Sequence, residues 1–318
     1  MTPRIAWIIT EGHAGMESQC RGLSEALGLD PIVKRVTIRL PWEWLPGRLW
    51  PRPLAALSRN SDRLEPPWPD IVISCGNVSA PLGVAIKRAS GGATRIVHIQ
   101  DPKMDPALFD FLVASRHDRL AGENVFVTRV AVHGVTAEKL AIAANAWRAK
   151  FANLPRPLVA VLVGGPNRRH QMTPGVVERL AAQLLALKQK HGASLAITPS
   201  RRTGAANTAI LRDRLSGSDV YFWQGQGPNP YLGLLALADA IVVTEDSVSM
   251  TSEACATGKP VYVVELRGQS RRIGKFHDML RSDGVTRRFD GTLAAWTYAP
   301  LDDTARAAAA IRARLGWR

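Results

Sequence analysis

Short hydrophobic runs alternate with longer amphipathic segments along this chain of 318 residues. Runs of this length followed by polar residues are typical of parallel strands buried on both faces, and the segments between them have helical periodicity. The predicted strands are residues 5–9, 32–38, 70–74, 159–163, 241–244 and 261–264. The predicted helices include residues 20–27, 137–151, 174–191 and 272–282 and a last helix near the C-terminus. This alternation predicts an α/β fold built from βα units.

Residues 229–264 carry the clearest pattern, which is helix, buried strand, polar loop, helix and second buried strand. The loop between strands 241–244 and 261–264 begins where open α/β sheets bind ligands, at the carboxyl end of a strand. Its polar side chains are those of Glu245, Asp246, Ser247 and Ser249. A helix that begins near Ser249 would direct its backbone N–H groups and positive dipole end at an anion such as a diphosphate. Glu253, one turn into that helix, could accept hydrogen bonds from ribose hydroxyls.

Two further loops in the second half end strands and carry charge. Gly164, Gly165 and Asn167 precede Arg168, and Ser200 precedes Arg201 and Arg202. Glycines let a backbone approach a phosphate, and arginines supply positive charge. The first loop is neither a P-loop nor a dinucleotide-binding fingerprint, and a tight turn without a ligand is the alternative.

A third loop, after the strand near residue 220, carries Trp223 and Gln226. Trp223 either stacks on a nucleotide base or packs internally, and Gln226 offers hydrogen-bonding groups to a base edge.

The first half supplies two candidate catalytic residues. Gly12 and His13 lie in the first βα turn, and Asp101 follows a strand that contains His98. Histidine can act as a general base near neutral pH, whereas a loop histidine without a catalytic task is the alternative. His98 and Asp101 do not form a closed set of metal-ligand spacings, so no metal site is predicted.

Length and linkers predict two domains. The segment ANLPRP follows helix 137–151, which divides the chain into residues 1–152 and 153–318, with the C-terminal helix packing near the interdomain junction. No apolar run approaches the roughly 20 residues that cross a bilayer, and no signal-peptide pattern is recognisable. The three cysteines lack disulfide spacing, which suits a reducing compartment. We therefore expect a cytoplasmic protein, either free or peripheral at the inner face of a membrane.

The net charge of +14 favours an anionic partner, namely a phosphorylated substrate, a membrane surface or nucleic acid. An arginine-rich codon usage is the alternative cause. Between residues 39 and 59, Trp42, Trp44 and Trp50 alternate with arginines, as in segments that enter the headgroup layer of a membrane. Interior packing is the favoured interpretation of these tryptophans, because large aromatic side chains more often serve burial. Nucleic-acid binding is not expected, since the arginines are spread over many loops and no nucleic-acid module is recognisable.

The motifs GHAGMESQ, VHIQDPK, FDFLVASRHD, VHGVT, VLVGGPN, ITPSRRT and TEDSVSMTSEACATGKPVYV occur in this order over nearly the whole chain. In this respect the chain resembles the family of the plant mitochondrial-fission (elongated mitochondria) proteins and their bacterial relatives. More remotely it is similar to GT-B nucleotide-sugar enzymes, including the N-acetylglucosaminyltransferase of peptidoglycan synthesis and the UDP-N-acetylglucosamine 2-epimerases. That resemblance implies two Rossmann-like domains with parallel sheets facing a central cleft, the first for an acceptor and the second for a nucleotide sugar.

The same resemblance implies roles for single residues. Ser247 and Ser249 would contact the diphosphate, Glu253 the ribose, and Gly164, Gly165, Arg201 and Arg202 would flank them. His13 occupies the place of a histidine in a glycine-rich turn of the lipid-linked transferase, although the run of glycines is missing here. For the plant proteins the family implies an adaptor role, in which they recruit a dynamin-like GTPase to mitochondria.

The leading hypothesis is a GT-B glycosyltransferase that moves a sugar from a nucleotide-diphosphate donor to an unknown, membrane-linked acceptor. The sugar nucleotide would be a substrate, and neither a metal nor another cofactor is expected. A non-catalytic, membrane-associated adaptor and a nucleotide-sugar epimerase are the alternatives. The base, the sugar, the acceptor and the oligomeric state are left open by the sequence.

Overall fold

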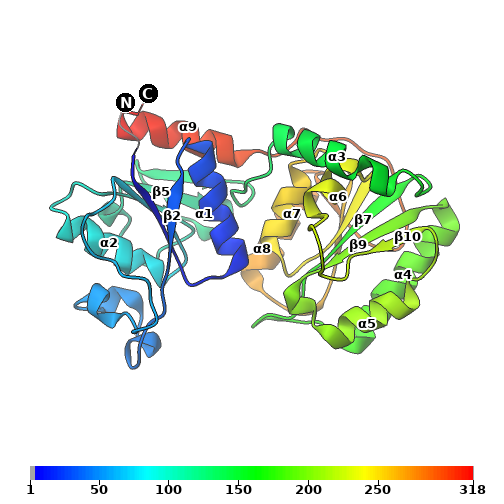
Figure 1. Cartoon of the computed structure of the whole chain (residues 1–318), viewed down its shortest axis with the longest axis horizontal. Helices are drawn as coiled ribbons and strands as arrows, with labels where there is room; N and C mark the ends of the chain where they lie inside the picture. Colours follow the sequence, from blue (N-terminus) through cyan, green and yellow to red (C-terminus); the bar gives the residue numbers. More distant parts are fainter. Residues whose placement is uncertain (1–3, 318) are drawn as a thin grey trace. The chain divides into compact units, whose positions relative to one another are not determined.

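The computed structural model describes residues 4–317, except for the side chain of His117, and divides into two compact units (Figure 1). Residues up to Gly134 and from Asp302 onward form the first unit, and Val135–Leu301 form the second. In the part of the chain that is described, no helix is long and apolar enough to span a membrane. Each unit contains one sheet of six parallel strands.

The sheet of the first unit has the order β2-β1-β3-β4-β5-β6. Its strands are β1 (Ala6–Thr10), β2 (Pro31–Arg35), β3 (Ile71–Cys75), β4 (Arg95–Ile99), β5 (Phe111–Ser115) and β6 (Val125–Thr128). Because side chains alternate along a strand, Ile8 faces helices α1 (Ala14–Ala26) and α9 (Asp303–Leu315), whereas Trp7 and Ile9 face helix α2 (Ser79–Ala89). Both faces of the sheet are therefore buried, as its continuous hydrophobic strands predict.

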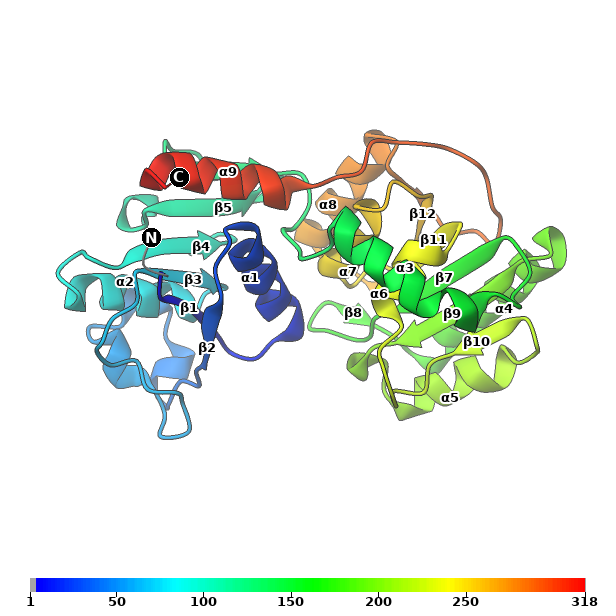
Figure 2. The ribbon, with the colours of Figure 1, turned by 45° about the horizontal axis from the view of Figure 1, so that its top comes forward.

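Helix α9 returns to the first unit, where it packs against α1 and completes the core (Figure 2). The carboxylate of Asp303 accepts hydrogen bonds from the backbone N–H groups of Arg129 and Val130. The Arg312 guanidinium donates to the carbonyl oxygen of Ala26 at the end of α1. Ile311 is fully buried in the cluster beneath α1.

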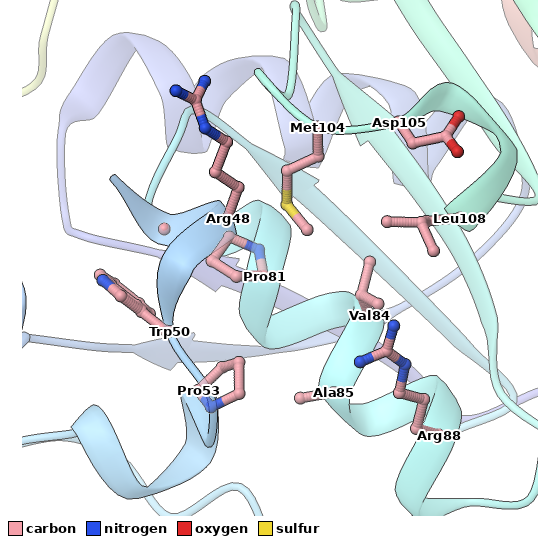
Figure 3. Close-up of a pocket in the computed structure, with 11 residues that line it drawn as sticks. Arg48, Trp50, Pro53, Pro81, Val84, Ala85, Arg88, Met104, Asp105 and Leu108 are labelled. Carbon is pink, nitrogen blue, oxygen red and sulfur yellow. The ribbon is translucent and has the colours of Figure 1, made fainter. Parts of the chain in front are cut away.

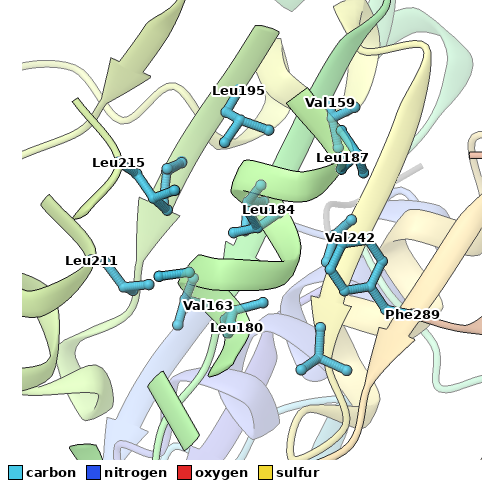
Figure 4. Close-up of a cluster of buried hydrophobic side chains, with 14 of the residues drawn as sticks. Val159, Val163, Leu180, Leu184, Leu187, Leu195, Leu211, Leu215, Val242 and Phe289 are labelled. Carbon is cyan, nitrogen blue, oxygen red and sulfur yellow. The ribbon is translucent and has the colours of Figure 1, made fainter. Parts of the chain in front are cut away.

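The second unit has the strand order β10-β9-β7-β11-β12-β14. Its strands are β7 (Leu158–Val163), β9 (Ser194–Pro199), β10 (Val220–Phe222), β11 (Ala240–Thr244), β12 (Val261–Val264) and β14 (Thr286–Arg288). Helices α4 (Pro174–His191) and α5 (Ala205–Arg214) enclose a core on one face of this sheet, in which Leu180, Leu184 and Leu187 of α4 meet Val159 and Val242 (Figure 4). The other helices are α3 (Ala137–Phe151), α6 (Tyr231–Leu237), α7 (Val248–Cys255) and α8 (Arg271–Ser282). A small antiparallel pair joins β8 (His170–Gln171) to β13 (Arg267–Gly268).

Helix α3 belongs to the second unit, although it precedes the ANLPRP linker. Gly233 of α6 gives α3 room to approach, because a Cβ there would lie 2.4 Å from Cγ of Trp147. Phe151 stacks on Trp147 and meets the ring of Tyr221 edge-on. The division between the units thus lies one helix before the boundary predicted at residues 152–153, because packing on α6 outweighs the break that the linker makes in the sequence.

The bounds predicted for α3 and α4 agree with the structure, whereas two other elements differ by more than one residue at an end. The helix predicted at 20–27 begins at Ala14, because Gly12 adopts a left-handed φ of 83° and the chain turns into the helix directly after it. The strand predicted at 32–38 ends at Arg35, and beyond it Ile38 makes only an isolated bridge to Leu57.

Candidate functional site

The strand order of the second unit defines where a ligand would bind. Its first strand, β7, lies in the middle, the next two follow on one side, and β11 begins the other side. The connections therefore diverge between β7 and β11, and open α/β sheets bind ligands at the carboxyl ends of the strands beside such a point. The loops after β7, β9 and β11 are those that carry most of the candidate binding residues.

Asp246 holds these three loops together. Its side chain is completely buried and lies 2.7 Å from the guanidinium of Arg202, which follows β9. The same carboxylate accepts hydrogen bonds from the backbone N–H of Gly165 at 3.1 Å and from the Thr244 hydroxyl at 2.7 Å. Since a buried carboxylate requires a compensating charge, much of the charge of Arg202 is committed to Asp246.

Gly164 and Gly165 are required by this packing. A Cβ at Gly164 would lie 2.3 Å from an oxygen of Asp246, and a Cβ at Gly165 would lie 2.2 Å from the backbone of Arg202. The carbonyl oxygen of Gly164 accepts a hydrogen bond from the Ser200 hydroxyl at 3.0 Å. These glycines therefore bring protein groups close together, a role that their sequence pattern did not reveal.

The remaining residues of the two charged loops differ in exposure. Asn167 closes the loop after β7, because its side-chain oxygen accepts from the backbone N–H groups of Arg169 and His170 at 2.8 and 2.9 Å. Arg168 and Arg201 are exposed. Arg202 has its charge committed to Asp246, so Arg168 and Arg201 are the predicted arginines that present their charge to solvent.

Helix α7 begins directly after the buried Asp246. Ser247 is its N-cap, and the serine side chain accepts from the backbone N–H of Met250 at 3.2 Å. Ser249 lies in the first turn, as predicted, although the helix starts one residue earlier, at Val248. The first N–H groups of a helix have no partner within it, so this end attracts negative charge.

Glu253 lies on the next turn of α7 and is nearly buried. The hydroxyl of Tyr231, at the start of α6, donates a hydrogen bond to the Glu253 carboxylate. Burial and the neighbouring carboxylate raise the pKa of Tyr231 well above its usual value, so this phenol keeps its proton and remains a donor. Tyr231 was missed in the sequence, where only its position at the start of the helix before the loop could have indicated it.

Glu245 is held by α8 and by the chain after β12. Its carboxylate accepts from the backbone N–H of Leu266 at 2.6 Å, and its own carbonyl oxygen lies 2.8 Å from Nε2 of His277. Burial lowers the pKa of His277 to about 4, so the ring is neutral and must carry its hydrogen on Nε2 to donate to this carbonyl. His277 therefore fixes the backbone at the start of the loop.

Gln226 lies apart from this cluster in the sheet. It follows β10, the edge strand, whereas the other binding candidates follow β7, β9 and β11. The backbone carbonyl oxygen of Gln226 accepts a hydrogen bond from the indole N–H of Trp223 at 3.1 Å. The loop after β10 is therefore closed by its own residues.

The two candidate catalytic residues lie in the first unit at the same edge of its sheet. His13 follows β1 and is exposed, and its carbonyl oxygen begins α1 by accepting from Met16 and Glu17. Asp101 follows β4, and because β3 lies between β1 and β4, the two strand ends are roughly 10 Å apart. Asp101 forms an ion pair with Lys103 and accepts from its backbone N–H at 2.9 Å.

The turn that carries Asp101 is strained. Gln100 has a φ of 77°, which is uncommon for a residue with a side chain and is found preferentially at functional sites. His98, in contrast, is buried with Nδ1 2.8 Å from the Ser74 hydroxyl, and burial lowers its pKa to about 3. Among the side chains that the structure describes, which do not include that of His117, no group of three or more His, Cys, Asp or Glu is placed to hold a metal ion.

Solved structures that share this fold include GT-B glycosyltransferases and UDP-GlcNAc 2-epimerases. The UDP-GlcNAc 2-epimerase from Methanocaldococcus jannaschii, in complex with UDP-GlcNAc and UDP, is 14% identical, with a TM-score of 0.59 over 98% of this chain and 99% of that one. The glycosyltransferase SnogD from Streptomyces nogalater is 15% identical, with a TM-score of 0.54 over 99% of this chain and 96% of that one. The predicted GT-B-like α/β fold is thereby confirmed.

The family model described as mitochondrial fission ELM1 matches residues 14–315. The chain belongs to this family, as its motifs predict. The mitochondrial fission protein ELM1 of Arabidopsis thaliana is 37% identical over an alignment of 279 residues, and the match covers 78% of this chain and 65% of that protein. The chain thus spans about two thirds of the length of this plant relative.

Proposed function

We propose that this protein is a glycosyltransferase that takes a sugar from a nucleotide-diphosphate donor and passes it to a membrane-linked acceptor. The observation that carries the proposal is the meeting of the loops after β7, β9 and β11 at the divergence of a Rossmann sheet, next to the N-terminus of α7. The solved epimerase complex with UDP-GlcNAc and UDP supports this class of ligand for the fold.

In this proposal the second unit binds the donor. The N-terminus of α7, with Ser249 in its first turn, faces the diphosphate, and Arg168 and Arg201 add positive charge. Glu253, oriented by Tyr231, accepts hydrogen bonds from the ribose. Asp246 and Arg202 do not contact the ligand in this scheme but keep the loops in place, because they bond to each other.

The transfer itself requires a leaving group and a base. The bond between the sugar and the diphosphate breaks, and the nucleoside diphosphate leaves with the bonding electrons. Helix N-termini and arginines stabilise the charge that develops on it. The acceptor oxygen bonds to the sugar carbon, and His13 takes the hydroxyl proton, with Asp101 two strands away at the same edge of the first sheet.

Two other functions use the same observations. An epimerase would convert the donor without an acceptor, and it is favoured by the likeness to the archaeal epimerase. An adaptor would bind membranes without turnover, and it is favoured by the plant relative, whose name places it in mitochondrial fission. Turnover distinguishes the three functions. An epimerase turns over with the donor alone, a transferase only when an acceptor is present, and an adaptor not at all.

Donor binding is the first test. A ligand that binds only the folded state raises the melting temperature, so a screen of nucleoside diphosphates and their sugar conjugates identifies the base. We expect Ser249→Trp and Glu253→Ala to abolish the shift, while Asp213→Ala, which removes an exposed carboxylate of α5, leaves it unchanged. Wild-type shifts in both site variants would contradict the assigned site.

A further inference from the structure

Large exposed apolar side chains are concentrated in one segment of the first unit. Among the residues that the structure describes, eight such side chains are exposed, and four of them are Leu40, Trp44, Leu45 and Leu49. Trp44 is 76% exposed, Leu40 59% and Leu49 58%. Single exposed apolar residues need no explanation, but a cluster within ten residues marks an interaction surface.

The segment is fixed in this conformation by Trp50. This side chain is buried, and its indole N–H lies 3.1 Å from the carbonyl oxygens of both Trp42 and Leu45. Gly47 packs directly on α2, because a Cβ there would lie 2.8 Å from the ring of Pro81. The expectation of interior packing is thus correct for Trp50 and wrong for Trp44, which the anchored turn holds in solvent.

Positive charge surrounds this apolar surface. Arg39, Arg48, Arg52 and Arg59 are exposed, and Glu43 is the single acidic residue between positions 39 and 59. A protein partner whose surface carries both positive and negative charges would not require this excess of arginine over acidic residues. Phosphates of an anionic lipid layer would complement it, and tryptophan prefers the interface at which they lie.

A cavity of about 210 Å³ lies between this segment and α2 (Figure 3). Arg88 of α2 turns its guanidinium towards the cavity, whereas that of Arg48 points away from the other lining residues, and Val84, Met104 and Leu108 supply apolar walls. Asp105 also lines the cavity, but its carboxylate accepts a hydrogen bond from the backbone N–H of Ala107. The Arg88 guanidinium beside an apolar wall fits a lipid phosphate and the first methylenes attached to it.

We propose that residues 39–52 dock onto an anionic phospholipid bilayer, with Leu40, Trp44 and Leu49 inserted among the headgroups and Arg39, Arg48 and Arg52 on phosphates. The inference deepens the proposed function and rests on it for the membrane-linked acceptor. Its evidence, however, lies entirely in this segment of the first unit. A peripheral enzyme held in this way would meet its acceptor at the bilayer surface.

Vesicle flotation with the full chain tests the inference. We expect binding to vesicles of phosphatidylcholine mixed with phosphatidylglycerol, much weaker binding to phosphatidylcholine alone, and a decrease as salt is raised. Arg48→Glu should weaken binding at least about tenfold, because it replaces an attractive charge by a repulsive one. Trp44→Ser combined with Leu49→Ser should weaken it similarly. Ile142→Ser, which changes a 63% exposed apolar residue of α3, is the matched control.

Three outcomes would overturn the inference. They are failure of the wild type to bind anionic vesicles, wild-type binding by the Trp44 and Leu49 variant, and an equal loss in the Ile142 control. Self-association that disappears in the Trp44 variant, without vesicle binding, would instead assign the surface to a second copy of the chain. Measuring the donor-induced shift in melting temperature on the same preparations separates the proposed transferase from the proposed membrane docking. Normal vesicle binding without any such shift would contradict the transferase and leave the docking intact.

Discussion

The guanidinium of Arg202 lies 2.7 Å from the carboxylate of Asp246, and although the aspartate side chain is fully buried, that of the arginine is 46% exposed. This pair connects the loop after β9 to the loop after β11. Because Asp246 also accepts from Gly165 after β7, one carboxylate sets the relative positions of three strand ends. A ligand site at these strand ends depends on this contact even if neither side chain touches the ligand.

Removal of Arg202 tests that dependence. Breaking a buried pair costs about 3–5 kcal/mol, and because Arg202 is half exposed we expect about 2 kcal/mol for Arg202→Ala. The adjacent Arg201→Ala, which removes an exposed guanidinium, should change the free energy of unfolding by less than about 0.5 kcal/mol. Urea denaturation measures both values. Equal costs for the two variants would show that the contact with Asp246 contributes little.

Gly164→Ala should destabilise the second unit. Its new methyl group would meet the Asp246 carboxylate, and overpacking of this kind costs roughly 1–3 kcal/mol. Gly175→Ala is the matched control, because the site in α4 is open and alanine is the better helix former, so stability should hold or rise. Thermal unfolding of the two variants decides this, and a Gly164 variant as stable as wild type would contradict the packing role.

Stability should fall as the pH is lowered from about 6.5 to about 4, because His277 is buried as a neutral ring. Its pKa is about 4 in the folded state, below the value of about 6.5 in an unfolded chain. The unfolded state therefore binds more protons, so this contribution is complete above about pH 6.5 and is lost progressively between pH 6.5 and 4. The expected slope is about 1.4 kcal/mol per pH unit in the middle of that interval. His277→Gln should make the free energy of unfolding depend less on pH between 4 and 6.5, as measured by urea denaturation at several pH values. An unchanged slope would contradict the role given to His277.

Tyr231→Phe should weaken donor binding without removing the ribose-binding carboxylate. Phenylalanine retains the ring but loses the hydroxyl that orients Glu253. We expect the dissociation constant for the donor to rise about tenfold, which corresponds to about 1.4 kcal/mol. Calorimetric titration measures the change, with Tyr221→Phe in β10 as the control. If only the control weakens binding, the role given to Tyr231 is wrong.

Trp50→Phe should loosen the segment at residues 39–52. The substitution keeps an aromatic ring in the core but removes the N–H that bonds to the carbonyls of Trp42 and Leu45. Trypsin should then cleave faster after Arg48, whereas Trp44→Phe, at an exposed position, should leave the rate unchanged. Fragment masses identify the cleavage sites. Identical cleavage in both variants would mean that the indole does not anchor the turn.

The sequence predicted the elements whose signals are local. Helices α3 and α4 and strand β12 were placed at their observed bounds, because periodicity, Pro174 and Gly192 determine them within a short window. The loop after β11 was also identified, since polar residues directly after a buried strand identify a sheet edge.

Features that depend on distant contacts were missed. Gly164 is required by Asp246, which lies more than eighty positions further along the chain, and no local pattern distinguishes this glycine from one that approaches a phosphate. The contact of Tyr231 with Glu253 and the different burial of Trp44 and Trp50 likewise depend on which element lies opposite.

The return of α9 to the first unit has a consequence for synthesis on the ribosome. Val135–Leu301 form an insertion within the first unit, and every residue of the inserted unit leaves the exit tunnel before α9 does. The second unit can therefore complete its core while the first still exposes the apolar surface that Ala307, Ala308 and Ile311 later cover. In the nascent chain the core of the first unit can therefore be completed only after the whole second unit has been synthesised.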